Sequence, residues 1–331
     1  MTIAIVGSTG AVGQAILSVL EKRAFPFHTL KCFASSQSVG KSFSFLGKEI
    51  TIEPLTSSCF QGIDLAFFAA GSAVSLQFAK EAVSQGCLVI DSSSAFRMDP
   101  VVPLVIPEIN SYALSHHQGI IASPNCTATM ALMTLFPLHK SAPLKRVVMS
   151  TYQAASGAGY QGMQHLKEET KAFLNQTPFS SNVFPHPYAF NLFPHNAPMT
   201  ASRYNEEEVK VMEESRKILQ LPHLKMGVTC VRVPVMRAHS LSINVEFTRG
   251  ISPEEAYTVL ATSPGITVLE NWEENRFPMP VDASGQDAVF VGRIRQDLSQ
   301  ENALDLWVVG DQLLKGAALN AVQIAEALAS F

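Results

Sequence analysis

The chain opens with an apolar run followed by an amphipathic segment, and this alternation continues through its first third. Thr2–Val6 has the pattern of a short strand, and a helical pattern from Gln14 to about Lys22 follows it. Further strands are predicted at about 28–34, 63–69 and 87–91, with a helix at about 74–85. Strands that alternate with helices predict a parallel, doubly wound sheet, in which ligands lie at the carboxyl ends of the strands.

Beyond about residue 145 the pattern changes, because strand patterns there follow one another without regular helices between them. Strands are predicted at about 146–152, 226–233, 240–247, 288–295 and 304–309, and helices at about 160–174, 205–219 and 312–328. The segment 178–198 is rich in Phe, Pro and Asn and is predicted to be a loop. The sequence therefore predicts an α/β fold class: a doubly wound parallel sheet plus a second domain of the α+β type with an antiparallel or mixed sheet.

Composition narrows the class of protein. The 331 residues, 47% of them apolar, are enough for two domains with sizeable cores. Lys and Arg number 24 against 28 Asp and Glu, a net charge of −4 without a long basic block, which argues against nucleic acid as a partner. No apolar run of about 18 residues predicts a membrane span, and the N-terminus lacks the basic lead-in of a signal peptide. The five cysteines are far apart, which favours a reducing cytoplasm over disulfides or a zinc site.

A glycine-rich turn joins the first predicted strand to the first predicted helix. Gly7, Gly10 and Gly13 have the spacing G-x-x-G-x-x-G. Small residues there let the backbone approach a pyrophosphate, and the start of the helix supplies N–H donors and a favourable dipole. An ordinary glycine-rich turn is the alternative, but the position at the first strand favours dinucleotide binding.

The segment after the second predicted strand bears on the choice of dinucleotide. An NAD site places Asp or Glu near the end of this strand, yet no acidic residue occurs between Glu21 and Glu49. The segment from Ser35 to Lys41 offers hydroxyls, an amide and a lysine, which suit the 2′-phosphate of NADP. A plain polar loop explains the same residues equally well.

Cys126 lies at the predicted start of a helix. Pro124 ends the preceding apolar run, and Asn125 is a good N-cap. In the first helical turn the free N–H groups and the helix dipole favour a thiolate and can stabilise an oxyanion. We therefore expect Cys126 to be a nucleophile; the alternative is a small Cys packed in the core.

Other polar residues are candidate site residues because of their positions in the predicted elements. Arg97 follows the strand that ends at Asp91, at the ligand-binding edge of the sheet, although a surface arginine fits the local sequence as well. His239 is a candidate general acid–base beside a cysteine nucleophile. Glu207 and Lys210 share one face of a predicted helix, where a solvated surface is the simpler interpretation.

Motifs in a fixed order along the chain resemble the aspartate-β-semialdehyde dehydrogenase family. The motifs are Gly7-x-x-Gly10-x-x-Gly13, Ser123-Pro-Asn-Cys126-Thr127, Gln153-Ala-Ala-Ser156-Gly157, Arg232-Val-Pro-Val-Met-Arg-Ala-His239-Ser240 and Gly310-Asp311-Gln-Leu-Leu-Lys315-Gly316-Ala-Ala-Leu-Asn320. The resemblance implies a Rossmann-type NADP-binding domain of residues 1–124 with 311–331, and a catalytic and dimerisation domain of residues 125–310 that resembles glyceraldehyde-3-phosphate dehydrogenase.

The resemblance also implies roles for single residues. Cys126 resembles the acyl-thioester nucleophile, His239 the acid–base and Gln153 the residue that orients substrate. Arg232 and Glu207 resemble the partners of the substrate carboxylate and amino group, and Arg97, Asn125 and Lys210 the phosphate-binding set. Cofactor contacts are implied for Gly7, Thr9, Gly10, Ala11, Val12, Ser36, Gln37, Ser38, Ser156, Gly157 and Gln312.

The implied reaction is NADPH-dependent reductive dephosphorylation of β-aspartyl phosphate to aspartate semialdehyde and phosphate. It serves the biosynthesis of lysine and diaminopimelate, threonine and methionine. The resemblance implies a cytoplasmic homodimer, or a tetramer of two dimers, without a metal. Gln37 stands where the family often carries Arg, Gln312 and Leu314 replace the usual Asn and Arg, and Ala238 replaces a common Gly.

Two other functions remain compatible with the sequence. N-acetyl-γ-glutamyl-phosphate reductase has the same architecture and acts on a related acyl phosphate, but Glu207 favours a substrate with a free amino group. A nucleotide-sensing protein without catalysis is the other, and Cys126, Gln153 and His239 argue against it.

Overall fold

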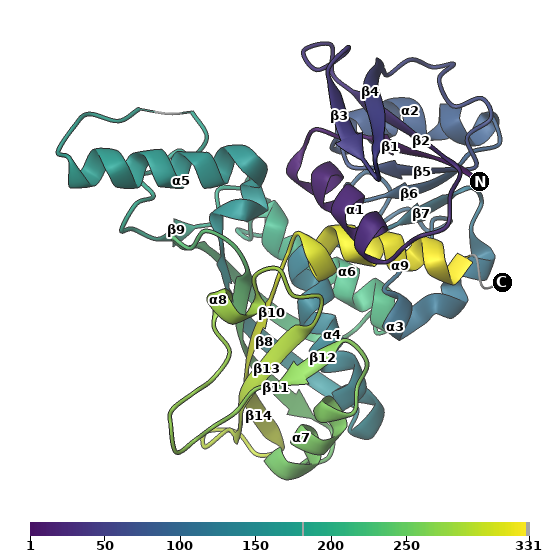
Figure 1. Cartoon of the computed structure of the whole chain (residues 1–331). Coiled ribbons are helices and arrows are strands. Elements are labelled where there is room, and N and C mark those ends of the chain that lie inside the picture. The colour runs from purple at the N-terminus through teal and green to yellow at the C-terminus, as the bar shows by residue number, and fades with distance from the viewer. Residues whose placement is uncertain (181, 329–331) are drawn as a thin grey trace. The chain divides into compact units, whose positions relative to one another are not determined.

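The computed structural model describes residues 1–180 and 182–328, and the chain forms two compact units (Figure 1). The first unit consists of residues 1–125 and 317–328, and the second of residues 126–180 and 182–316. The domain boundaries implied by the resemblance, 1–124 with 311–331 and 125–310, stay predictions. Residues 329–331 of that range lie outside the described residues.

The first unit is built on a mostly parallel sheet with the strand order β3-β4-β2-β1-β5-β6-β7. Its strands are β1 (Thr2–Val6), β2 (Thr29–Ala34), β3 (Ser42–Phe45), β4 (Lys48–Pro54), β5 (Leu65–Phe68), β6 (Leu88–Asp91) and β7 (Ile120–Ala122). All neighbours pair in parallel except β3 and β4, which are antiparallel. The predicted doubly wound sheet is confirmed.

Helices cover both faces of this sheet. They are α1 (Ala11–Lys22), α2 (Ser72–Ser84), α3 (Pro107–Asn110), the 3-10 helix η1 (Ser111–His116) and α9 (Leu319–Leu328). Helices α1 and α9 pack together on one face, and α2 covers the other (Figure 1). With both faces covered, β5 is buried along its whole length, which explains its uninterrupted apolar sequence.

The β3–β4 hairpin was not predicted from the sequence. It is joined by Leu46 and Gly47, both with positive φ (49° and 74°), as in the tight turns that connect antiparallel strands. Phe43 and Phe45 alternate with serines, so the strand pattern is present but short. Because β3 pairs only with its neighbour at the edge of the sheet, its sequence carries little of the apolar signal of the central strands.

The second unit is built on a mixed sheet with the strand order β12-β13-β14-β11-β8-β10-β9, as predicted for this half of the chain. Its strands are β8 (Leu144–Gln153), β9 (Phe193–Pro194), β10 (Lys225–Arg232), β11 (His239–Phe247), β12 (Ile266–Val268), β13 (Val289–Gln296) and β14 (Ala303–Gly310). Strands β8 and β10 are parallel, whereas β11 is antiparallel to both β8 and β14. The carboxyl ends of β8 and β10 therefore lie side by side and bring Gln153 next to Arg232.

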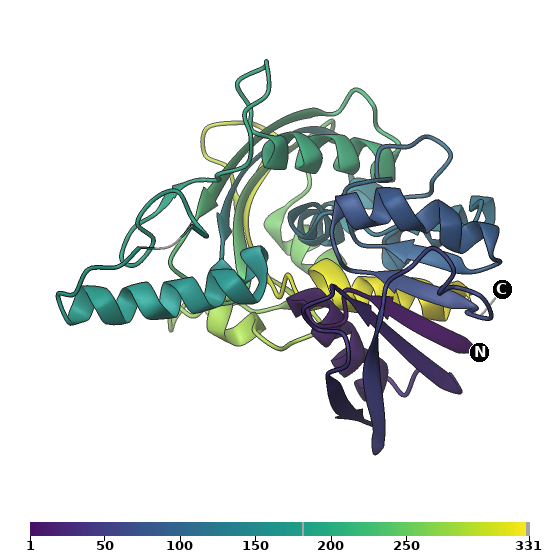
Figure 2. The same cartoon turned by 90° about the horizontal axis from the view of Figure 1, so that it is seen from above.

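The helices of this unit are α4 (Cys126–Ser141), the 3-10 helix η2 (Ala155–Ala158), α5 (Gly159–Leu174), α6 (Glu206–Leu219), α7 (Pro253–Ala261) and α8 (Pro280–Ala283). Helix α6 packs against β10 and α4, whereas α5 projects away from the sheet (Figures 1 and 2). A capping box at Asn205 and Glu208 starts α6, because each side chain accepts a hydrogen bond from the other residue's backbone N–H.

The C-terminal helix was predicted to begin at about Gln312, but α9 begins only at Leu319. A π-helical turn, η3 (Leu314–Ala318), precedes α9. Ahead of this turn the Asp311 carboxylate accepts a hydrogen bond from the backbone N–H of Leu313. Such widened turns occur often at functional sites.

Among the described residues, no helix combines the length and the apolar character needed to cross a bilayer.

Candidate functional site

The glycine-rich turn after β1 excludes side chains for steric reasons. Gly7 has φ +88°, and a Cβ atom on it would lie 2.8 Å from the carbonyl oxygen of Ala69. A Cβ atom on Gly13 would lie 2.2 Å from the carbonyl oxygen of Gly7. The turn and the start of α1 therefore pack as bare backbone, the arrangement that lets a pyrophosphate approach the helix N-terminus.

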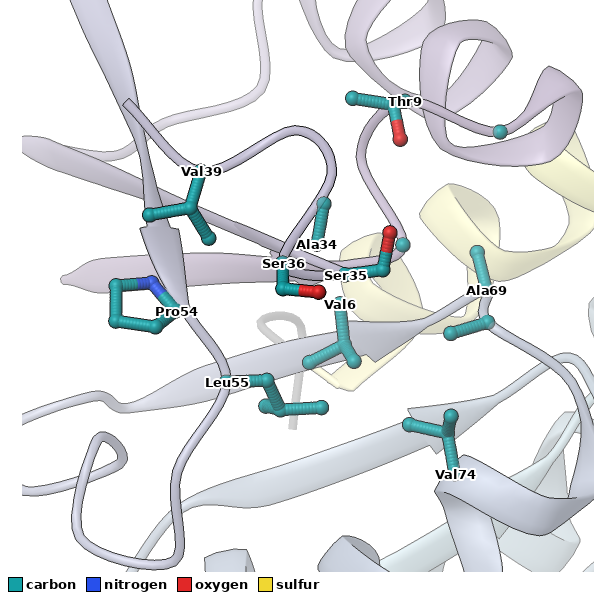
Figure 3. A pocket seen from close by; sticks show the side chains of 13 residues that line it. Val6, Thr9, Ala34, Ser35, Ser36, Val39, Pro54, Leu55, Ala69 and Val74 are labelled. Atoms are coloured by element: carbon teal, nitrogen blue, oxygen red, sulfur yellow. The ribbon is translucent and has the colours of Figure 1, made fainter. Parts of the chain in front are cut away.

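A cavity of about 700 Å³ opens beside this turn, within the size range of cofactor sites (Figure 3). Its lining residues are Val6, Gly7, Thr9, Gly10, Ala34, Ser35, Ser36, Val39, Pro54, Leu55, Ala69, Ala70 and Val74. Of these, Ser35 and Ser36 follow the end of β2, and no carboxylate is found among the described residues that line the cavity. The residues present fit a dinucleotide, and this edge of the cavity suits a phosphate better than a bare ribose diol.

Some of the predicted cofactor residues of this unit line the cavity, and others do not. Gly7, Thr9, Gly10 and Ser36 line the cavity, and Ala11 and Val12 form the first turn of α1 next to it. Gln37 and Ser38 belong to the same loop but are not among the lining residues. The apolar part of the lining was not predicted from the sequence; it consists of Val39, Pro54, Leu55, Ala69, Ala70 and Val74. Most of these follow strand ends, and the rule for ligands at carboxyl edges was the signal that could have found them.

Arg97 is buried in the first unit rather than exposed on its surface. Its Nε donates to the carbonyl oxygen of Ser123 at 2.9 Å, and its Nη2 donates to that of Ser92 at 2.8 Å. Both carbonyls lie just beyond strand ends, so Arg97 is held at the carboxyl edge of the sheet. The phosphate role implied for Arg97 and for the buried Asn125 stays a prediction.

Cys126 is the first residue of α4 and is partly exposed. Burial raises the pKa of the other four thiols, to about 12 for Cys32 and Cys87. The π-helical turn packs closely against Cys126, since a Cβ atom on Gly316 would lie 2.7 Å from the Cβ of Cys126. Cys126 is thus the cysteine best placed to act as a nucleophile.

Gln153 ties the cysteine helix to α6. Its Nε2 donates to the Thr127 hydroxyl at 3.1 Å and to Oε1 of Glu207 at 3.3 Å. Thr127 directly follows Cys126, so the Gln153 amide links the start of α4 to the Glu207 carboxylate. Thr127 is part of the cysteine motif, but no role was predicted for it from the sequence, although its place beside the cysteine was a signal.

His239 is completely buried, and its tautomer is set by the backbone. The N–H of Ala154 donates to Nδ1 of His239 at 3.0 Å, so the neutral ring carries its proton on Nε2. Burial, assisted by the charge of Arg232, holds the pKa of His239 well below its usual range. Nε2 is a buried atom without a partner among the described residues, and it is therefore a donor available to a ligand.

Arg232 is only 6% exposed. Its guanidinium lies over the Phe184 ring at 5.7 Å, and its Nη1 reaches the carbonyl oxygen of Ala154 at 3.5 Å. Its Nε has no partner in the described chain. Burial lowers the pKa of Arg232, against the opposing effects of Tyr188, Glu207 and Cys126. A buried guanidinium with an unused donor has the chemistry to bind a carboxylate, and the role implied for Arg232 stays a prediction.

Gly157 marks the point where these groups meet. A Cβ atom on Gly157 would lie 2.9 Å from Nη1 of Arg232 and 3.0 Å from Nε2 of His239. The glycine therefore keeps open the space that both side chains face.

The remaining predicted residues form contacts within the second unit. Gln312 accepts from the backbone N–H of Ala238 at 3.1 Å through Oε1, and its Nε2 donates to the Ser156 hydroxyl. Lys210 pairs with Glu206 at 3.6 Å along α6. The cofactor role of Ser156, Gly157 and Gln312 and the phosphate role of Lys210 stay predictions.

The first unit has the glycine turn and cavity of a dinucleotide site, and the second unit contains Cys126. Together they define the class of protein, a two-domain NAD(P)-dependent oxidoreductase. The family model described as the semialdehyde dehydrogenase NAD binding domain matches residues 2–117, and that of the semialdehyde dehydrogenase dimerisation domain matches residues 135–315. The chain belongs to the aspartate-semialdehyde dehydrogenase family.

Full-length relatives support this assignment. Aspartate-semialdehyde dehydrogenase of Synechocystis sp. is 50% identical over 98% of this chain and 96% of its own length. That of Bacillus subtilis is 42% identical over 98% and 96%. The crystal structure of aspartate semialdehyde dehydrogenase II from Vibrio cholerae, complexed with ASA, has a TM-score of 0.97 at 38% identity and covers 99% of this chain and 98% of that one.

Proposed function

We propose that this chain catalyses the NADPH-dependent conversion of β-aspartyl phosphate to aspartate semialdehyde and phosphate through a thioester on Cys126. The single observation that supports this best is the buried guanidinium of Arg232, which faces the same space as His239. A nucleophile, a hydrogen-bond donor and a carboxylate site in one place suit an acidic acyl substrate.

In the first step the Cys126 sulfur attacks the acyl carbon. A carbon–sulfur bond forms, the carbon–oxygen bond to phosphate breaks, and phosphate leaves with the bonding pair. The N–H groups at the start of α4 and the Nε2–H of His239 are the donors that we assign to the developing oxyanion. We assign the leaving phosphate to Lys210, Arg97 and Asn125.

In the second step the thioester is reduced and the thiolate is released. NADPH, when bound, supplies the hydride. The resulting oxyanion on the Cys126 adduct accepts a hydrogen bond from Nε2 of His239, and its collapse breaks the carbon–sulfur bond. Because Nδ1 accepts from Ala154, the ring acts as a donor throughout, which is the acid side of the role implied by the resemblance.

We assign the two ends of the substrate to one residue of β10 and one residue of α6. We assign the α-carboxylate to Arg232 and the amino group to Glu207, with Gln153 fixing Glu207 and Thr127 together. The cofactor belongs to the cavity at the glycine turn, and Ser35 and Ser36 at the end of β2 support NADP over NAD.

The test is to mix the protein with aspartate semialdehyde, phosphate and NADP⁺ and to follow NADPH formation. Mass spectrometry without phosphate detects the acyl group on Cys126. We expect Cys126→Ala to abolish both signals while NADP⁺ binding and the fold are retained. Near-normal turnover in this variant would remove Cys126 from the mechanism.

The same assay separates the two alternatives. N-acetylglutamate semialdehyde lacks the free amino group that we assign to Glu207, so it is expected to be a poor substrate. Faster turnover of that aldehyde would assign the chain to the related reductase. A protein that binds NADP⁺ but forms no adduct with either aldehyde would be a nucleotide sensor.

The second unit matches a dimerisation domain, and we propose that the chain forms a homodimer. Tyr160, Phe173 and Leu174 of α5 are exposed, and Phe173 packs against exposed Phe190 with ring centres 4.8 Å apart. Such a patch is typical of an interface.

Phe173→Glu is expected to weaken the dimer in sedimentation experiments, whereas Leu298→Glu, at a fully exposed position, leaves it unchanged. The same experiment shows whether dimers pair into tetramers. A cytoplasmic location stays a prediction.

A further inference from the structure

His195, which the mechanism above does not use, follows the short strand β9. Strand β9 pairs with β10 so that Phe193 lies opposite Arg232 and Pro194 opposite Val231. The backbone N–H of His195 then donates to the carbonyl oxygen of Cys230 at 2.8 Å, which continues the same register. Opposed residues of antiparallel strands project to the same face, so the side chain of His195 shares a face with Cys230 and Arg232.

The backbone also fixes which nitrogen of His195 carries the proton. The N–H of Ala197 donates to Nδ1 of His195 at 3.1 Å. The neutral ring therefore has its hydrogen on Nε2 and presents a donor. The pair resembles that of Ala154 with His239, so both imidazoles near Arg232 are oriented by a backbone N–H on Nδ1.

The surroundings of His195 are those of the substrate site. Its pKa is lowered to about 4, first by burial and then by the charges of Arg232 and Lys210, against the effect of Glu207. His195 in turn contributes to the lowered pKa of His239. His195 is therefore neutral at physiological pH and keeps its Nε2–H donor, beside the guanidinium that we assign to the substrate carboxylate.

We propose that His195 is a further substrate-binding residue, whose Nε2–H donates a hydrogen bond to the α-carboxylate of the substrate alongside Arg232. This inference depends on the function proposed above. A carboxylate has two oxygens with several acceptor sites, so it can accept from the unpartnered Nε of Arg232 and from a second donor on the same face. A neutral donor adds a hydrogen bond at this place without adding a second buried charge next to Arg232.

A residue that binds the carboxylate is expected to affect substrates that have this group, and not the reaction at the aldehyde. We would compare aspartate semialdehyde with 3-aminopropanal, which has the same amino and aldehyde groups but lacks the carboxylate. For His195→Leu we expect the KM for aspartate semialdehyde to rise by about tenfold or more, as for loss of a hydrogen bond to a charged group. The KM values for phosphate and NADP⁺, and kcat/KM for 3-aminopropanal, are expected to stay within about twofold of wild type.

His195→Gln provides the rescue, because its amide can place an N–H where Nε2 lies, and we expect it to recover most of the lost affinity. His186→Leu is the matched control, since His186 is an exposed histidine of the same loop that also contacts Phe193. It is expected to leave all constants unchanged.

An equal loss of kcat/KM for both aldehydes in His195→Leu would overturn the proposal and indicate a structural role. A rise in the phosphate KM alone would also overturn it and place His195 at the phosphate. Failure of the wild-type protein to oxidise aspartate semialdehyde would instead refute the proposed function, so the two failures are distinguishable.

Discussion

The guanidinium of Arg232 and the imidazole of His239 flank the same point, the position that a methyl group on Gly157 would occupy. That methyl group would lie 2.9 Å from Nη1 of Arg232 and 3.0 Å from Nε2 and Cε1 of His239. The two residues come from β10 and from the first position of β11, and η2 brings Gly157 between them. The absence of a side chain at one residue thus preserves the space in which we place the substrate.

Gly157→Ala is expected to reduce kcat/KM by at least about a hundredfold, because small displacements of catalytic groups have effects of this size. The fold should survive, since Gly157 has no positive φ and lies next to the site rather than in a core. Steady-state kinetics and circular dichroism are the measurements. Gly227→Ala is the matched control, because its new methyl group would meet only Val148, at an ordinary 3.8 Å. Near-normal kinetics in Gly157→Ala would show that Arg232 and His239 do not need their present positions.

Cys126 is expected to react with iodoacetamide well before the other cysteines. Burial raises the pKa of Cys32, Cys59, Cys87 and Cys230 and so depletes their thiolates, whereas Cys126 is partly exposed at a helix start. Peptide mapping after brief treatment at pH 7 measures the order of labelling. Cys126→Ala is the control and should remain largely unlabelled over the same period. Preferential labelling of Cys59, the other partly exposed cysteine, would contradict this assignment.

His195 is expected to make the protein less stable in mild acid. In the unfolded chain its pKa is near 6.5, whereas the folded value is about 4. Below pH 6.5 the unfolded state therefore binds more protons than the folded state, and the free energy of unfolding falls with pH until about pH 4. At pH 5 this loss is about 2 kcal/mol relative to pH 8.

The measurement is urea unfolding of the wild type and of His195→Gln at both pH values. The variant lacks the titrating group, so it is expected to lose less stability on acidification by about that amount. His239 adds a loss in the same direction in both proteins, and because His195 helps to lower the pKa of His239, part of the difference between the two proteins comes from His239. Equal losses in the two proteins would mean that His195 titrates alike in both states.

Ala238→Gly is expected to stabilise the protein slightly. Ala238 has φ +71°, a left-handed conformation that costs a residue with a Cβ atom about 1–2 kcal/mol. Glycine removes this cost but loses about 0.5–1 kcal/mol of entropy on folding, so the expected gain is about 0.5 kcal/mol. Urea unfolding measures it. Ala201→Gly, at an exposed position without positive φ, should show only the entropic loss, and a similar loss at Ala238 would indicate that the turn is not strained.

The sequence predicted the local elements that short-range sterics determine. The strand Thr2–Val6, the glycine turn and the helix after it are present because Gly7 and Gly13 exclude side chains and the flanking residues have clear periodicities. Cys126 begins a helix, as Pro124 and Asn125 indicated. These features depend on neighbours in the chain, so the amino-acid order contains the necessary information.

Elements with weak local signals were missed. Strand β9 has only Phe193 and Pro194, inside a segment interpreted as loop, and it exists because β10 offers it an edge. The π-helical turn at Leu314–Ala318 has no sequence pattern of its own, and Gly316 is required there by the closeness of Cys126. Long-range pairing overrides local preference at such places.

By itself the amino-acid sequence determined the class of the fold, the helix that starts at Cys126 and the order of the motifs along the chain. Only the tertiary structure decided that Arg232 is buried with an unused donor, that a backbone N–H orients each of His239 and His195, and that His195 shares a face with Arg232. The physical reason is that these relationships join residues distant in the chain through strand register, which is settled when the whole sheet is buried.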